Sequence, residues 1–320
     1  MFIFNKDIFI PDIDLWLDSR RVRDYGFISH AHADHIANHR KIICSPPTAD
    51  LLKFRLKKRN FLEVPFNDAI EYKNYKLTLL PAGHILGSAQ ILLENSETSL
   101  LYTGDFKLSV SRTAEKYKAV HADTLIMETT FGSEKYCLPH RKDSEAYLIE
   151  LCKEKLRKGL TPVVFAYQLG KGQEALKILT DAGMEVSVDH QIMKYVSIYE
   201  KYGIQFGNFR VYKPSEPANC VILLSSGFRY RRKLKTDSVY TVFLSGWGMG
   251  HHAEKRYGVD EVIPISDHAD YNELFKAVEM ISPKKIYCTH GSAEFVYKLR
   301  AEGFAAYKLE TMHQLELDLF

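Results

Sequence analysis

The chain has 320 residues, 46% of them hydrophobic and 26% charged, which predicts about two globular domains and excludes a disordered protein. Its formal net charge is only +3, so bulk electrostatics alone do not indicate a nucleic-acid-binding protein. No apolar run approaches the roughly 20 residues of a membrane-spanning helix, the N-terminus lacks the pattern of a secretion signal, and the five cysteines form no C-x-x-C pair. We therefore expect a cytoplasmic protein without a membrane partner, a disulfide scaffold or a zinc finger.

Short strands separated by turns dominate the first third of the chain. Apolar runs predict strands at residues 26–29, 76–80, 89–94, 99–103 and 124–127. Several of these runs end beside a glycine and a histidine or an aspartate, which is where site residues often lie.

The middle of the chain changes to an alternation of helices and strands. Helices are predicted at 143–158 and 172–181, and strands at 162–166 and 220–224. A helix at 271–281 and a strand at 285–288 follow. Because such an alternation is typical of a parallel α/β layer, we interpret residues 1–132 and 263–320 as one fold, split by an inserted α/β domain at 133–262.

The strongest chemical signal is an H-x-H-x-D-H motif formed by His30, His32, Asp34 and His35, directly after the first predicted strand. Neutral imidazole nitrogens and carboxylate oxygens are good Zn²⁺ ligands. His30 and His32 are two residues apart in an extended stretch and therefore point to the same side. Asp34 and His35 follow at once and can serve a second ion nearby, an arrangement that hydrolyses phosphodiesters.

Further ligands must come from distant parts of the chain. His84 lies in a turn between two predicted strands, Asp105 ends the strand at 99–103, and His290 ends the strand at 285–288. Each could be an ordinary turn residue, but together with the histidine motif they are candidate ligands.

This set of residues resembles the metal-binding motifs of the metallo-β-lactamase superfamily, and Glu128, His268 and His290 resemble motifs A, B and C of its β-CASP nuclease branch. The closest resemblance is to the ligase-associated DNA exonucleases, a short form of that branch. It rests on Leu-Asp-Ser-Arg at 17–20, Pro-Ala-Gly-His-Ile-Leu-Gly-Ser-Ala-Gln at 81–90, Ser-Gly-Trp at 245–247 and Ser-Asp-His-Ala-Asp at 266–270. The resemblance implies an α/β fold, a four-layer αβ/βα sandwich with an inserted β-CASP domain.

The same resemblance implies a role for each site residue. One Zn²⁺ would be held by His30, His32 and His84, and a second by Asp34, His35 and His290, with Asp105 bridging the two. His268, oriented by Glu128, would be a general acid or a phosphate contact. We expect catalysis to depend on Asp34, His268 and Glu128, and the ligand types would also tolerate Mn²⁺.

Two basic runs, at 53–59 and 229–235, are candidate nucleic-acid contacts, although solvated surface is an equal interpretation. The second run alternates with Tyr230 and follows a serine pair. The candidate substrate contacts are Ser225, Ser226, Gly227, Arg229, Arg231 and Arg232.

The sequence therefore favours a zinc-dependent exonuclease of single-stranded DNA that acts in association with a DNA ligase. Three alternatives stay open: a β-CASP endo- or exoribonuclease of RNA processing, a small-molecule metallo-hydrolase, and a metal-containing nucleic-acid-binding protein without catalysis.

Overall fold

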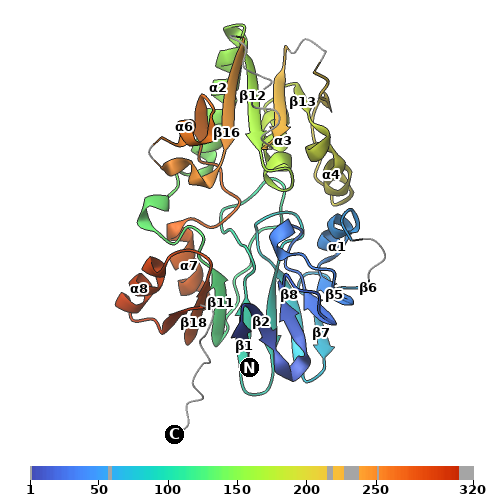
Figure 1. The fold of residues 1–320 in the computed structure, drawn as a ribbon, viewed down its shortest axis with the longest axis vertical. Coiled ribbons are helices and arrows are strands. Elements are labelled where there is room, and N and C mark those ends of the chain that lie inside the picture. Colours follow the sequence, from blue (N-terminus) through green and yellow to red (C-terminus); the bar gives the residue numbers. More distant parts are fainter. Residues whose placement is uncertain (1, 57–59, 215–218, 227–237, 251, 310–320) are drawn as a thin grey trace. The chain divides into compact units, whose positions relative to one another are not determined.

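The computed structural model describes residues 2–56, 60–214, 219–226, 238–250 and 252–309, which form two compact units (Figure 1). Unit 1 contains residues 1–110, 114–133 and 268–320, and unit 2 contains residues 111–113 and 134–267. None of the helices in the described ranges is long and apolar enough to span a membrane.

Unit 1 is built around two sheets. The first has six strands in chain order: β1 (Ile3–Asn5), β2 (Asp7–Ile10), β3 (Leu15–Leu17), β4 (Tyr25–Phe27), β5 (Lys41–Cys44) and β6 (Asn60–Glu63). The strands from β3 to β6 pair in parallel, which makes the histidine segment after β4 a crossover rather than a tight hairpin. Ser45 caps the single α-helix of this part, α1 (Pro46–Lys53), by accepting a hydrogen bond from the amide of Thr48.

The second sheet has seven strands in the order β19-β18-β11-β10-β9-β8-β7. They are β7 (Ala69–Tyr72), β8 (Tyr75–Pro81), β9 (Ala89–Glu94), β10 (Ser99–Tyr102), β11 (Thr124–Glu128), β18 (Lys285–Thr289) and β19 (Ala306–Lys308). Leu15 and Phe27 of the first sheet share one buried cluster with Leu77 and Leu93 of the second, so the two sheets pack face to face.

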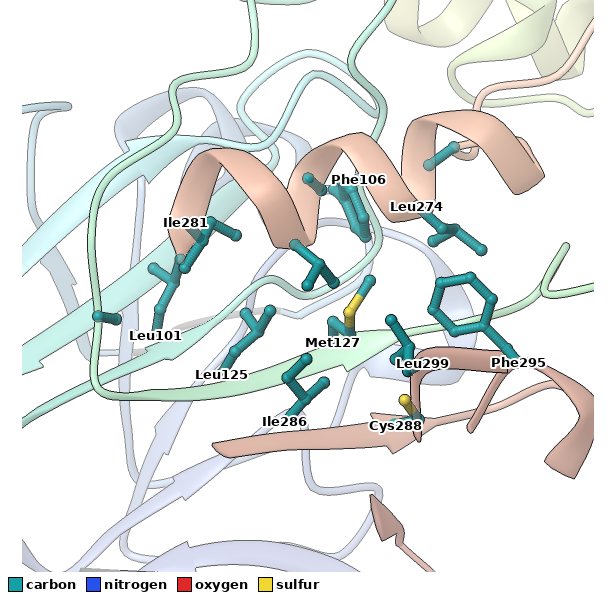
Figure 2. Close-up of a cluster of buried hydrophobic side chains, with 14 of the residues drawn as sticks. Leu101, Phe106, Leu125, Met127, Leu274, Ile281, Ile286, Cys288, Phe295 and Leu299 are labelled. Atoms are coloured by element: carbon teal, nitrogen blue, oxygen red, sulfur yellow. The ribbon is translucent and has the colours of Figure 1, made fainter. Parts of the chain in front are cut away.

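Two helices, α7 (Tyr271–Ile281) and α8 (Ala293–Ala301), cover the outer face of the second sheet. Figure 2 shows Leu274 and Ile281 of α7 and Leu299 of α8 pointing onto Leu125 and Ile286 of the strands. All five are fully buried, and burial of one such side chain contributes about 1.5–3 kcal/mol. The α/β sandwich expected from the sequence is confirmed.

Unit 2 is a parallel six-stranded sheet in the order β14-β13-β15-β12-β16-β17. Its strands are β12 (Thr161–Ala166), β13 (Val186–Val188), β14 (Phe209–Val211), β15 (Val221–Ser225), β16 (Val239–Leu244) and β17 (Glu261–Ile263). Its helices are α2 (Arg141–Arg157), α3 (Lys171–Asp181), α4 (His190–Lys201) and α6 (Ala253–Tyr257). Val164, Leu176, Val196 and Leu223 belong to the buried cluster that joins sheet and helices. The alternation of strands and helices that the sequence predicted for this region is confirmed.

Candidate metal centre

Each candidate ligand from the second sheet lies where a strand ends. β10, β11 and β18 are parallel, so their carboxyl ends reach one edge of the sheet, and β8 reaches the same edge because β9 is antiparallel to both of its neighbours. His84 follows β8, Asp105 follows β10, Glu128 ends β11 and His290 follows β18. The topology therefore gathers side chains that are as many as 206 positions apart (290 minus 84) at one edge.

The glycine before Asp105 brings that carboxylate to the histidine segment. Gly104 has φ of 55°, and a Cβ added there would lie 2.6 Å from Cβ of Ser29. Only a residue without a side chain permits this close approach of the two loops. As a result, Asp105 reaches the residue that follows Ser29, and Oδ2 of Asp105 lies 3.5 Å from Nε2 of His30.

His30, His32, His84 and Asp105 form a compact group in which the potential ligand atoms all lie within 4.8 Å of one another. Nε2 of His84 is 3.1 Å from Nδ1 of His32 and 3.9 Å from Oδ2 of Asp105. All four residues are buried. Three imidazoles and one carboxylate that converge on one point are a donor set suited to Zn²⁺.

The hydrogen bonds of His30 fit a metal ligand. Ser29 donates its hydroxyl to Asp18 (2.6 Å), so its oxygen can only accept from Nδ1 of His30, which lies 2.9 Å away. The proton of a neutral ring therefore lies on Nδ1, and Nε2 carries a lone pair. Among the described residues, no hydrogen-bond partner reaches this fully buried Nε2. A buried nitrogen without a partner is costly, and a metal ion would satisfy it.

Burial and the neighbouring His35 and His84 rings hold the pKa of His30 well below its usual value. The ring is therefore neutral at pH 7, the form that binds metals.

The sequence analysis did not identify Asp18 as a residue of the site. Its carboxylate accepts four hydrogen bonds: from the amide and hydroxyl of Ser29 (2.7 and 2.6 Å), from Nδ1 of His35 (2.8 Å) and from the hydroxyl of Tyr102 (2.9 Å). Because a carboxylate only accepts, Nδ1 of His35 must carry a proton, which leaves Nε2 of a neutral ring to bind metal. The motif Leu-Asp-Ser-Arg at 17–20 contains Asp18, but it contributed only to the family resemblance and indicated no role for this residue.

Asp34, His35 and His290 lie on the other side of Asp105 in a looser arrangement. Nε2 of His35 is 3.3 Å from Oδ2 of Asp105 and 3.8 Å from Oδ2 of Asp34, and the rings of His35 and His290 are 6.3 Å apart. The three residues line a pocket of about 400 Å³. Within the described ranges, neither Asp34 nor His290 belongs to a tight group of ligand atoms.

The neighbouring imidazole rings keep the carboxyl group of Asp105 negatively charged. Burial alone would raise the pKa of this carboxyl, but the His35 and His268 rings hold it well below its usual value. Burial would likewise lower the pKa of His35, yet the carboxylates of Asp105 and Asp18 raise it well above normal. Asp105 is thus an anion between two groups of imidazoles, which is the position a bridging ligand needs.

His268 is held by Glu128 at the same edge. Nδ1 of His268 is 2.8 Å from Oε1 of Glu128 and 4.0 Å from Oδ2 of Asp105. Buried Glu128 also accepts from the amides of Phe106 and Thr130 (both 3.2 Å), so its carboxylate is fixed. Because Nδ1 faces this carboxylate, Glu128 sets the orientation of the His268 ring.

The backbone around His268 is anchored as well. The amide of Ala269 donates to the carbonyl of Phe106 (2.7 Å), one residue from Asp105. Asp270 and Glu273 then form a capping box that begins α7. The segment that carries His268 is therefore fixed to the loop that carries Asp105.

The candidate substrate contacts belong to unit 2 of the chain. Ser225 is buried, and its amide and hydroxyl donate to Asp189 (2.7 and 2.6 Å), which caps α4. The amide of Ser226 donates to the carbonyl of Ala166. The remaining four, Gly227, Arg229, Arg231 and Arg232, lie outside the described residues.

Comparisons with known proteins agree with this chemistry. Residues 253–313 match the family model of a Zn-dependent metallo-hydrolase RNA specificity domain. The chain is 37% identical over 321 residues to a probable DNA ligase of Opitutus terrae, an alignment that covers 99% of this chain and 32% of that protein. The chain thus spans about a third of that relative's length.

Two further relatives are named as nucleases. The chain is 33% identical over 369 residues to the probable RNase MJ4 of Methanocaldococcus jannaschii, which covers 89% of this chain and 85% of that protein. It is 25% identical over 303 residues to the 5′ exonuclease Apollo of Danio rerio, which covers 86% of this chain and 50% of that protein.

Proposed function

The chain belongs to the β-CASP nuclease branch of the metallo-β-lactamase superfamily and is a metal-dependent nuclease, and from this premise we propose that it is a zinc-dependent exonuclease of single-stranded DNA. The observation that carries the proposal is the buried Nε2 of His30, which has no hydrogen-bond partner among the described residues and lies beside His32, His84 and Asp105. The nuclease relatives favour this function over a small-molecule hydrolase or a binding protein without catalysis.

We assign one Zn²⁺ to His30, His32 and His84, with Asp105 as the ligand shared with a second ion. The compact group of buried donors supports the first assignment. The second Zn²⁺ is assigned to His35, Asp34 and His290, which border the same pocket. Bound Zn²⁺ would acidify a water molecule and neutralise charge on the phosphoryl oxygens.

The chain's own residues contribute the remaining chemistry. Asp105 holds its negative charge between the two groups of imidazoles at neutral pH because the rings lower its pKa. The Glu128 carboxylate, fixed by two amides, orients His268 through Nδ1 and stabilises a proton on that ring. His268 can then donate a proton from Nε2 to the leaving oxygen of the cleaved phosphodiester.

The preference for DNA rests on the similarity to the probable DNA ligase of Opitutus terrae, which extends over 99% of this chain. The same similarity supports action in association with a DNA ligase. Ribonuclease activity is the second candidate, because the matched family model is an RNA specificity domain and one relative is the probable RNase MJ4. Manganese is a second candidate metal, since it accepts the same oxygen and imidazole ligands.

A cleavage time course tests the proposal. Single strands of DNA and RNA with matched sequences, labelled at the 5′ or the 3′ end, are incubated with the protein and Zn²⁺ or Mn²⁺. We expect progressive shortening of DNA from one end and little loss of RNA. Preferred degradation of RNA would transfer the assignment to the second candidate.

The matched variants are Asp34→Asn, which removes a proposed ligand charge, and Asp12→Asn, whose carboxylate accepts from the hydroxyl of Tyr75 (2.9 Å). We expect Asp34→Asn to lose most activity and Asp12→Asn to retain it. Equal rates for Asp34→Asn and the parent would show that the named centre is not the active one.

A further inference from the structure

Trp247 is a large aromatic side chain that unit 2 leaves 40% exposed. It lies in a short 3-10 helix, η4 (Gly246–Met249), which follows β16 and precedes α6 (Figure 1). Met249 in the same turn is 39% exposed. The turn thus presents two partly exposed apolar side chains, which makes it a candidate contact site.

The turn is held rigidly although its side chains are exposed. The hydroxyl of Ser245 accepts from the amide of Trp247 (3.2 Å). A Cβ added at Gly248 would lie 2.5 Å from Cγ1 of Val262, so the backbone packs closely on β17. The ring of Tyr136 stands at 85° to the indole with centroids 5.1 Å apart. The indole is therefore presented in a preorganised position, which reduces the entropy lost on binding.

Two cations, Lys135 and Arg256, lie beside this pair of rings. Nζ of Lys135 lies 5.0 Å from the centroid of Tyr136, and Nη2 of Arg256 donates to the carbonyl of Trp247 (3.4 Å). Lys135, Lys255 and Arg256 are all exposed. An exposed aromatic beside cations matches what the bases and phosphates of a single strand require.

We propose that Trp247 and Tyr136 form a stacking platform for a base of single-stranded nucleic acid, with Lys135 and Arg256 near the adjoining phosphates. The choice of occupant rests on the proposed nuclease function, but the platform uses none of the proposed metal ligands. Because every base has an aromatic face, the platform binds strands without strong sequence preference. It gives Ser-Gly-Trp at 245–247, which the metal centre does not use, a direct role in holding substrate.

Intrinsic fluorescence can test the platform, because the chain has two tryptophans. The other, Trp16, stacks on Phe9 with centroids 4.3 Å apart. Trp16→Phe leaves Trp247 as the sole tryptophan, which can be excited selectively over the tyrosines. The zinc-loaded protein is titrated with a thymidylate dodecamer with phosphorothioate linkages, which resist cleavage. The second probe has the same backbone with abasic positions throughout.

We expect saturable quenching of Trp247 by the thymidylate strand and much weaker binding of the abasic strand. By fluorescence anisotropy of a labelled strand, Trp247→Ala should weaken binding by about 5- to 150-fold, and Trp247→Phe should keep most of it. Tyr297→Ala, which removes an aromatic ring that is 65% exposed in unit 1, is the matched control and should bind as the parent does.

Binding of the Trp247→Ala variant within twofold of the parent, or equal affinity for both strands, would overturn the platform. Hydrolysis of bis(p-nitrophenyl) phosphate distinguishes this failure from failure of the proposed function. Hydrolysis of that small ester by the parent protein reports on the metal centre without a bound strand, and we expect the Tyr297→Ala control to hydrolyse it at the parent rate. A parent protein that hydrolyses neither the ester nor any strand would refute the nuclease proposal itself.

Discussion

Asp18→Asn is the change that probes most sharply how the metal ligands are oriented. The Asp18 side chain is only 5% exposed. Its Oδ1 accepts from the amide of Ser29, and its Oδ2 accepts from the hydroxyl of Ser29, from His35 and from Tyr102. The substitution keeps the size and shape of the side chain but replaces one acceptor oxygen by an NH2 donor.

The structure sets the consequence of that replacement. If the NH2 faces His35, Nδ1 of a neutral ring can no longer carry the proton, which moves to Nε2. Nε2 lies 3.3 Å from Asp105, and once protonated it can no longer bind metal. If the amide is flipped, the NH2 faces the backbone amide of Ser29 instead. Either arrangement leaves one buried donor without an acceptor, which should lower the free energy of unfolding by about 1–3 kcal/mol. Loss of such an orienting partner lowers metal affinity about 10- to 100-fold.

Competition with a chromogenic chelator measures the zinc affinity of the parent, of Asp18→Asn and of Asp12→Asn. Asp12 also bonds a tyrosine hydroxyl, but its Tyr75 partner is outside the metal centre, so this variant controls for loss of a carboxylate–tyrosine bond. We expect weaker zinc binding in Asp18→Asn alone, with unchanged circular dichroism. Parent-like zinc affinity in Asp18→Asn would refute the assignment of ring orientation to Asp18.

Three further results are expected. Gly291→Ala should lower the free energy of unfolding in urea far more than Gly303→Ala, because both glycines have positive φ but only a Cβ at 291 would meet the carbonyl of Thr129, at 1.9 Å. Glu174→Gln should lower the unfolding free energy at pH 7 by about 1–3 kcal/mol, because it removes one of the two carboxylates that pair with Arg141 and a charged acceptor of the Ser111 and Thr113 hydroxyls. Burial alone would raise the pKa of Glu174, but Arg141 and its hydrogen bonds lower it. The Glu174 carboxylate therefore stabilises the folded state fully above the unfolded pKa of about 4.3, and this stabilisation is lost as the pH falls below that value. The unfolding free energies of parent and variant should then converge in urea titrations at acid pH. Chelator should lower the melting temperature, and added Zn²⁺ should restore it, since a ligand of the folded state alone stabilises that state.

The sequence predicted several of the buried elements well because their patterns are local, but it missed the helices α1, α4 and α8 and the strand β16. The helix at 271–281 has the bounds of α7, since Asp270 and Glu273 provide its capping box and apolar residues recur on one face. The strand at 162–166 differs from β12 by one residue. The strands β1 to β3 and the short β13, β14 and β17 went unpredicted, because runs of three or four residues gain their order from neighbouring strands rather than from their own sequence.

The candidate site divides in the same way. The H-x-H-x-D-H motif is contiguous and could be recognised directly. His84, Asp105 and His290 were candidates from their positions at strand ends, and only the family resemblance assigned each of them to a particular ion. Asp18 could not be assigned a role, because its contacts with His35 and Tyr102 depend on the pairing of distant strands. All of the metal-binding roles stay predictions. Among the described residues, the tight groups of ligand atoms include His30, His32, His84 and Asp105 but leave out Asp34, His35 and His290.

Zinc content per folded chain tests the central claim most directly. Mass spectrometry of the metal is applied to the parent, to His84→Ala and to His121→Ala, whose ring bonds the carbonyl of Ile281 outside the metal centre. We expect about two zinc ions in the parent and in His121→Ala, and at most about one in His84→Ala, at equal circular dichroism. A parent without bound zinc, or a His84→Ala variant that retains the full parent content, would contradict the assembly of one metal centre from residues so far apart in the chain.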